Sequence, residues 1–234
     1  LWSSTPDAEL LASAAAGELR NPDVLAAQSR RMLSDPRIRR LATEFGAQWL
    51  HVRDLATLDE KSERHFPTFA DLRADMQEET VLFFVDLFQN DRSVLSLLDA
   101  DHSFVNKPLA EHYGIPIDGE DWRRVDGMRD RGRGGILGFS STLAKHSGAS
   151  RTSPILRGNW VYEVVLGEKL PKPPKDVPVL PDEAPEGLTE RQLIEQHSSD
   201  PSCARCHAKL DPLGFALEGF DAIGRFREGA DTQA

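Results

Sequence analysis

The spacing of apolar side chains predicts a succession of helices over the first half of the chain. Thr5, Asn21 and Asp35 each stand directly before a proline. A capping oxygen followed by proline favours a helix start, because proline at the first helical position gives up no hydrogen bond. We therefore expect each of these prolines to open a helix. The third helix has one apolar face, formed by Ile38, Leu41, Ala42, Phe45 and Trp49.

A longer amphipathic pattern begins at Thr68 and runs to about residue 88. Its apolar stripe has the spacing of one helical face and comprises Phe69, Leu72, Met76 and Phe83. The acidic residues that avoid this stripe are Asp71, Asp75, Glu78 and Glu79. Shorter helical patterns follow at 93–99 and 106–114, the second stopped by glycine.

The pattern changes at about residue 115. Glycines interrupt residues 118–141, which predicts turns with one short hairpin. The proline-rich strap 169–187 predicts an extended segment. A capping box of Thr189 and Gln192 then predicts a helix from 190 to about 198. The chain therefore reads as mainly α, with irregular glycine- and proline-rich segments in its second half.

Composition excludes several classes of protein. Hydrophobic residues make up 39% and charged residues 28% of the 234-residue chain, as in ordinary globular proteins. No run of 18 apolar residues is present, so we expect no membrane-spanning segment in this chain. The formal net charge of −10 argues against nucleic acid as a partner and favours a neutral or basic one. No basic, apolar leader opens the sequence, so a chain of this kind is either cytoplasmic or already processed.

Both cysteines of the chain lie in the motif Cys203-Ala-Arg-Cys206-His207. A zinc site would require a second pair of soft ligands, which the sequence lacks. A thioredoxin-like dithiol would require a strand–helix setting, and the sequence around the motif shows no strand pattern. A disulfide between the two cysteines would close a very small loop and would therefore stabilise the fold little. The fourth interpretation is one covalent haem c, with Cys203 and Cys206 as thioether anchors and His207 as the axial iron ligand.

The spacing has a physical reason in haem attachment. Two thiols three residues apart on one helical turn reach the two vinyl groups at one edge of a porphyrin, and the next residue then points at the iron. Pro212 lies where a small cytochrome c places the proline whose carbonyl oxygen accepts the proximal imidazole N–H. Apolar side chains that would line the haem follow at Leu213, Phe215, Ala216, Leu217 and Phe220.

Several long segments resemble one family, the large exported bacterial proteins known as planctomycete-type cytochrome c proteins. These segments are 1–11, 31–55, 97–115, 151–174 and 196–227. The resemblance implies a helical module at 1–118, followed by a cytochrome c-like monohaem module at 122–234. It also implies that the chain is a piece of a longer, exported protein. The family has no established activity, so the resemblance indicates architecture and cofactor but no reaction.

Several residues are candidates for the second axial ligand of the iron. No methionine or histidine follows His207, so the ligand comes from upstream, or the site is open. His146 in an irregular segment is the favoured candidate, ahead of Met128 and His197. Arg151 and Arg157 are candidate partners of the haem propionates, since guanidinium groups form bidentate ion pairs with carboxylates. Trp160 is a candidate ring to pack near the porphyrin.

These features predict a monohaem c-type cytochrome that transfers electrons within a larger periplasmic or extracellular assembly. Its partner would be a redox protein or a membrane or periplasmic complex. Two alternatives remain at this stage: a haem enzyme, peroxidase- or oxidase-like, with an open distal site, and a scaffold protein whose haem is structural. The ligation of the iron separates electron transfer from enzymatic chemistry.

Overall fold

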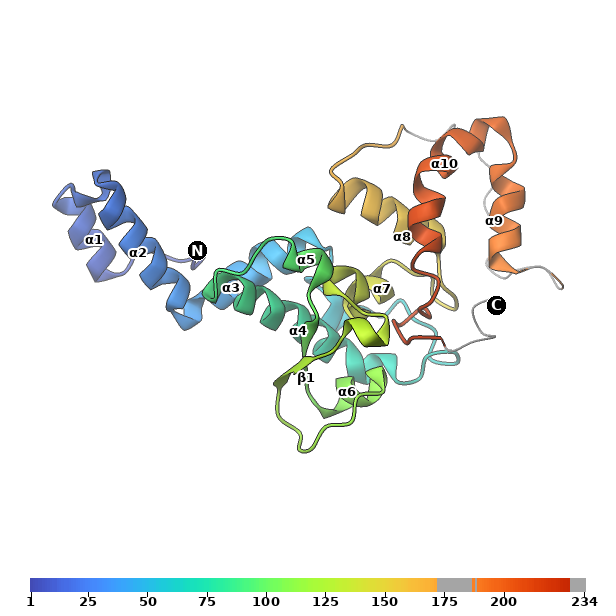
Figure 1. The fold of residues 1–234 in the computed structure, drawn as a ribbon, viewed down its shortest axis with the longest axis horizontal. Helices are drawn as coiled ribbons and strands as arrows, with labels where there is room; N and C mark the ends of the chain where they lie inside the picture. Colours follow the sequence, from blue (N-terminus) through green and yellow to red (C-terminus); the bar gives the residue numbers. More distant parts are fainter. Residues whose placement is uncertain (172–186, 188, 228–234) are drawn as a thin grey trace. The chain divides into compact units, whose positions relative to one another are not determined.

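The structure, a computed structural model, describes residues 1–171, 187 and 189–227 (Figure 1). The predicted mainly α fold is confirmed. Most of the predicted proline-rich strap, residues 172–186, lies outside the described residues. The chain forms two compact units, each with its own core. The first comprises Leu1–Leu58 and Leu72–Phe139, and the second comprises Asp59–Asp71 and Ser140–Ala234.

Two helices open the first unit, α1 (Ala8–Ala15) and α2 (Pro22–Ser34). The prediction for α2 is confirmed, because the Asn21 side chain accepts a hydrogen bond from the backbone N–H of Asp23. The predicted start of α1 is wrong by two residues. The N-cap is Asp7, whose carboxylate accepts from the backbone N–H of Leu10 at 3.0 Å, so proline precedes the cap.

The helix predicted from Pro36 is present but irregular. It runs through the 3₁₀ turn η2 (Pro36–Ile38), α3 (Arg39–Leu41) and the π-helical segment η3 (Ala42–Ala47). A π turn contains more residues than an α turn and therefore rotates the side chains that follow it. As a result Phe45, predicted in the buried face, is 52% exposed. Gly46 faces the core instead, where a Cβ atom would lie 2.6 Å from the ring of Phe84.

The central helix α4 (Phe69–Gln89) follows the predicted apolar stripe, whose four members are all buried. One of its acidic residues departs from the prediction. Glu79 is 0% exposed, and its carboxylate accepts hydrogen bonds from Ser103 Oγ at 2.5 Å and Tyr113 OH at 2.6 Å. Burial raises the pKa of Glu79 to about 7, although both hydrogen bonds act in the opposite direction. This buried acid ties α4 to the strand and helix that carry its partners.

The remaining elements of the first unit are short. The helices and 3₁₀ turns are η1 (Glu18–Arg20), η4 (Leu55–Thr57), α5 (Ser96–Asp99), α6 (Lys107–Tyr113), η5 (Arg129–Arg131) and η6 (Gly135–Gly138). A two-stranded antiparallel sheet pairs β1 (His102–Val105) with β2 (Arg123–Asp126). The glycine-rich segment therefore supplies one strand, and its partner lies upstream of α6 rather than within the same segment.

The second unit is built around a crossing of two helices, α8 (Pro154–Trp160) and α10 (Pro201–Phe215) (Figure 1). Glycines occupy the crossing: a Cβ on Gly158 would overlap the carbonyl oxygen of Leu210, and one on Gly214 would overlap that of Pro154. The other elements of this unit are α7 (Ser140–Lys145), the π-helical η7 (Val161–Val165) and α9 (Glu190–Ser198). The predicted capping box at the start of α9 is present.

Candidate functional site

Helix α10 carries the whole Cys203-Ala-Arg-Cys206-His207 motif in its first two turns. The helix begins there because Asp200 caps it, with its carboxylate accepting from the backbone N–H of Ser202 at 2.8 Å, and Pro201 follows at the first helical position. Cys203 is buried at 7% exposure, Cys206 is half-buried, and neither forms a disulfide. Residues three apart in an α-helix share a face, so the two thiols lie on one side of α10.

His207 forms a hydrogen-bonded pair with Asp211, one helical turn further along α10. The ring Nδ1 lies 2.8 Å from Asp211 Oδ1, and the two side chains are 10% and 11% exposed. An ionised carboxylate can only accept, so Nδ1 donates the proton, and in the neutral tautomer of the ring Nε2 then carries the lone pair. Burial raises the pKa of Asp211, and the hydrogen bond from His207 works against that rise.

The partner of the His207 ring is Asp211 and not the predicted Pro212. The prediction placed the imidazole N–H on the carbonyl oxygen of Pro212, whereas the structure directs it to the Asp211 carboxylate. Pro212 lies inside α10 with its ring exposed, and its carbonyl oxygen accepts from the backbone N–H of Ala216 at 3.2 Å. The helix continues through the proline, and its carbonyl group therefore points along the helix axis. The spacing of four residues between His207 and Asp211 was the available signal for this pair.

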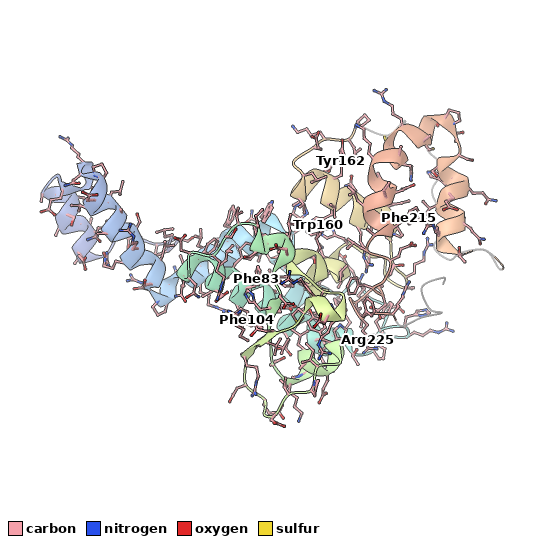
Figure 2. All side chains as sticks on the ribbon, in the orientation of Figure 1. Phe83, Phe104, Trp160, Tyr162, Phe215 and Arg225 are labelled. Carbon is pink, nitrogen blue, oxygen red and sulfur yellow. The ribbon has the colours of Figure 1, made fainter. Side chains whose placement is uncertain are left out.

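Helix α9 packs along α10 and brings a second histidine to the motif. The rings of His197 and His207 meet edge to face, with their centroids 5.1 Å apart. On the same helix, α9, Leu193 and Ile194 are buried. At the other end of the pair, the Arg191 guanidinium lies 4.6 Å from the centroid of the Phe215 ring, which projects from α10 (Figure 2). The two helices thus form one packed hairpin around His207.

Helix α8 and the π-helical η7 also pack against α10. The Lys209 ammonium donates to the hydroxyl group of Tyr162 at 3.2 Å, and both Tyr162 and Trp160 are visible in Figure 2. Val161 and Leu210 are buried, as are Leu217 and Phe220 beyond α10. Of the apolar residues predicted to line a haem, Leu217 and Phe220 therefore belong to the core of this unit.

His146, the favoured distal ligand, lies just after α7 and is half-buried. Its ring stacks on Trp160, with centroids 4.9 Å apart and an interplanar angle of 20°. His146 and Trp160, both predicted to lie near the haem, thus pack against each other. Met128, the second candidate, is buried in the first unit. The assignment of a distal ligand to either residue stays a prediction.

Arg157 does not have the predicted role of a propionate partner. It is 1% exposed, and its guanidinium donates to the backbone carbonyl groups of Leu217 at 2.8 Å, Phe220 at 2.9 Å, Leu143 at 3.3 Å and Asp221 at 2.5 Å. These bonds hold the segment after α10 against α7 and α8. A guanidinium committed to four carbonyl groups in the core has no exposed edge for a carboxylate. Arg151 is half-buried, and its predicted contact with a propionate stays a prediction.

Two family models match the chain in succession. A model described as protein of unknown function (DUF1592) matches residues 1–115, and one described as protein of unknown function (DUF1588) matches residues 133–230. No curated protein and no solved structure matches the chain. Within the part of the chain that the structure describes, no helix is both long and apolar enough to cross a membrane. The two matched domains are the planctomycete cytochrome c-associated domains, and the chain belongs to the family of planctomycete-type cytochrome c proteins.

Proposed function

We propose that this protein is a monohaem c-type cytochrome that transfers electrons as one module of a larger exported assembly. The observation that carries the proposal is the arrangement of Cys203, Cys206 and His207 on α10, within a cytochrome c-associated domain. The donor set fits the cofactor. Two thiols without a disulfide lie on one face of the helix, and the next residue is an imidazole with Nε2 free of the Asp211 bond.

Each residue of the motif has a separate task in this proposal. Cys203 and Cys206 would hold the haem through thioether bonds, each formed by addition of its S–H group across one vinyl double bond, so that sulfur bonds to one carbon and hydrogen to the other. Nε2 of His207 would bind the iron, while Asp211 holds the imidazole through Nδ1. Leu210 and its apolar neighbours exclude water from this part of α10. When bound, the haem supplies a one-electron couple between ferric and ferrous iron.

Absorption spectra of the purified protein in both redox states test the electron-transfer assignment. A six-coordinate, low-spin iron with two protein ligands is expected, with His146 as the favoured second ligand. A high-spin ferric iron that binds cyanide or peroxide would instead support a haem enzyme with an open distal site. A low-spin haem that no reductant or oxidant of physiological potential converts would support a structural role in a scaffold.

Export follows from the same proposal. Thioether attachment of haem c takes place outside the cytoplasm, so we place the mature protein in the periplasm or outside the cell. The net charge of −10 favours a redox partner with a neutral or basic docking face. Cell fractionation with an antibody against the chain tests the location, and a cytoplasmic pool that carries haem would contradict it.

A further inference from the structure

We propose that Asp211 is a positioning residue whose carboxylate accepts the Nδ1–H of the proximal imidazole and thereby lowers the reduction potential of the haem. The inference rests on the proposed function, because it concerns a haem bound through His207. In the arrangement expected from the sequence, a backbone carbonyl dipole receives the imidazole N–H. In this chain a carboxylate receives it, at 2.8 Å.

The shielding of the pair from water gives this difference its effect. The His207 and Asp211 side chains are 10% and 11% exposed, so the charge of Asp211 acts on the ring through a medium of lower dielectric constant than water. A hydrogen bond to an ionised acceptor is shorter and roughly twice as strong as one between neutral groups. The carboxylate therefore draws the Nδ1 proton further from the ring than a carbonyl group would, and the electron density at Nε2 rises.

Packing against α8 fixes the backbone that carries Asp211. Gly214 lies against the carbonyl group of Pro154, and the carbonyl group of Leu210 lies against Gly158. The turn of α10 that contains Asp211 is thus held at both ends by contacts that leave no room for a methyl group. His207 is held in turn by the ring of His197 at 5.1 Å. Both members of the pair are therefore placed before any cofactor is attached.

The consequence concerns the iron. A more basic axial imidazole donates more charge and stabilises ferric over ferrous iron, which lowers the midpoint potential. It also strengthens the bond between iron and Nε2. Both quantities can be measured on the haem-loaded protein without any assay of activity, and a residue that only stabilised α10 would change neither.

The main test replaces Asp211 by Asn, which keeps the shape and an acceptor oxygen but removes the charge. Potentiometric titration of Asp211→Asn should show a higher midpoint potential. At a fixed poise the ratio of ferrous to ferric protein should rise at least tenfold, which corresponds to about 59 mV for a one-electron couple. The Fe–N(His) stretching band of the ferrous protein after photolysis of bound CO should move to lower frequency.

Glu195→Gln is the matched control, because Glu195 is exposed on α9 and contributes a negative charge near Asp211 without contacting His207. Its shift in potential should be well below that of Asp211→Asn. Equal shifts in the two variants would show a general effect of charge and would overturn the proposal. An Asp211→Asn protein with the potential and the stretching band of the wild type would overturn it as well.

Two further outcomes separate this inference from the proposed function. If the wild type carries no covalent haem, the proposed function fails and the inference fails with it. If the wild type carries haem but the Asp211→Asn variant does not incorporate it, the frequency of the wild-type Fe–N(His) stretching band tests the inference instead. It should lie above that of a reference cytochrome c whose proximal histidine donates to a carbonyl group, and an equal or lower frequency would overturn the inference alone.

Discussion

Gly214 of α10 packs directly against the backbone carbonyl group of Pro154 at the start of α8, with no room between them for a Cβ atom. Gly158 meets the carbonyl group of Leu210 in the same way, four residues along each helix. Two glycines thus let the backbones of α8 and α10 approach more closely than side chains would allow. This approach fixes the helix that carries the cysteine–histidine motif.

We expect Gly214→Ala to destabilise the second unit, because the new methyl group overlaps backbone that cannot move away. The loss in the free energy of unfolding should be about 3 kcal/mol, at the upper end of the usual cost of overpacking. Urea unfolding followed by circular dichroism measures it. Gly219→Ala is the control, since its Cβ would meet only the Phe226 ring at an ordinary 3.5 Å. Equal stability of the two variants would show that the crossing is looser than described.

The buried Glu79 should make the stability of the first unit depend on pH. Its pKa is about 7 in the folded protein, against an ordinary value of 4.5, so the folded state binds the proton more tightly than the unfolded state. The stabilisation is therefore fully present below about pH 4.5 and is lost as the pH rises to about 7. The largest effect is about 3 kcal/mol, at about 1.4 kcal/mol per pH unit.

Glu79→Gln removes this dependence while keeping the hydrogen-bonding shape. The difference in unfolding free energy between the variant and the wild type should change between pH 5 and pH 7.5, with the variant gaining relative to the wild type at the higher pH. Glu111→Gln, at an exposed position on α6, provides the control. A difference that stays constant with pH in Glu79→Gln would mean that the acid is ionised throughout.

Replacing Arg157 by Lys should reduce stability without altering the haem. The lysine ammonium can donate to only some of the four carbonyl groups that the guanidinium now binds. Each buried acceptor that loses its donor costs about 1–3 kcal/mol of stability. We expect a loss of at least about 3 kcal/mol in thermal or urea unfolding. The midpoint potential at a temperature where the variant is folded should equal that of the wild type. If Arg157→Lys shifts the midpoint potential and Arg151→Lys does not, the result would contradict this account and would show that Arg157 pairs with the haem propionates.

His146→Ala tests the favoured distal ligand. If His146 binds the iron, the ferric protein should lose its low-spin near-infrared charge-transfer band for bis-histidine ligation and its potential should rise. His65→Ala, at an exposed position of the same unit, should leave both unchanged. A His146→Ala spectrum identical to the wild type would exclude His146, and Met128→Ala would then be the next variant to record.

Features that depend on neighbours in sequence were predictable from the sequence. The cap at Asn21, the capping box of Thr189 and Gln192, and the apolar stripe of α4 are all set by residues within one or two turns. The Cys203-Ala-Arg-Cys206-His207 motif is equally local, because its residues lie within little more than one turn of α10. Asp211 could have been recognised in the same way, since it lies one turn beyond His207.

Arg157 and Glu79 were mispredicted because their partners lie far away in the chain. Arg157 is committed to carbonyl groups about sixty residues downstream, and nothing in the local pattern distinguishes it from an exposed arginine. Glu79 is polar in every local pattern and becomes buried only because Ser103 and Tyr113 provide donors. Phe45 turned outward because a π-helical segment changed the period on which the prediction relied.

Intact mass spectrometry of the denatured chain tests the central claim most directly. The protein should be produced in a host with haem c maturation. The wild type should carry the mass of one haem that acid–acetone does not extract, because thioether bonds to Cys203 and Cys206 survive denaturation. Replacing both cysteines by alanine should abolish the added mass. A wild-type chain at its bare peptide mass would contradict the assignment of a covalent haem to this protein.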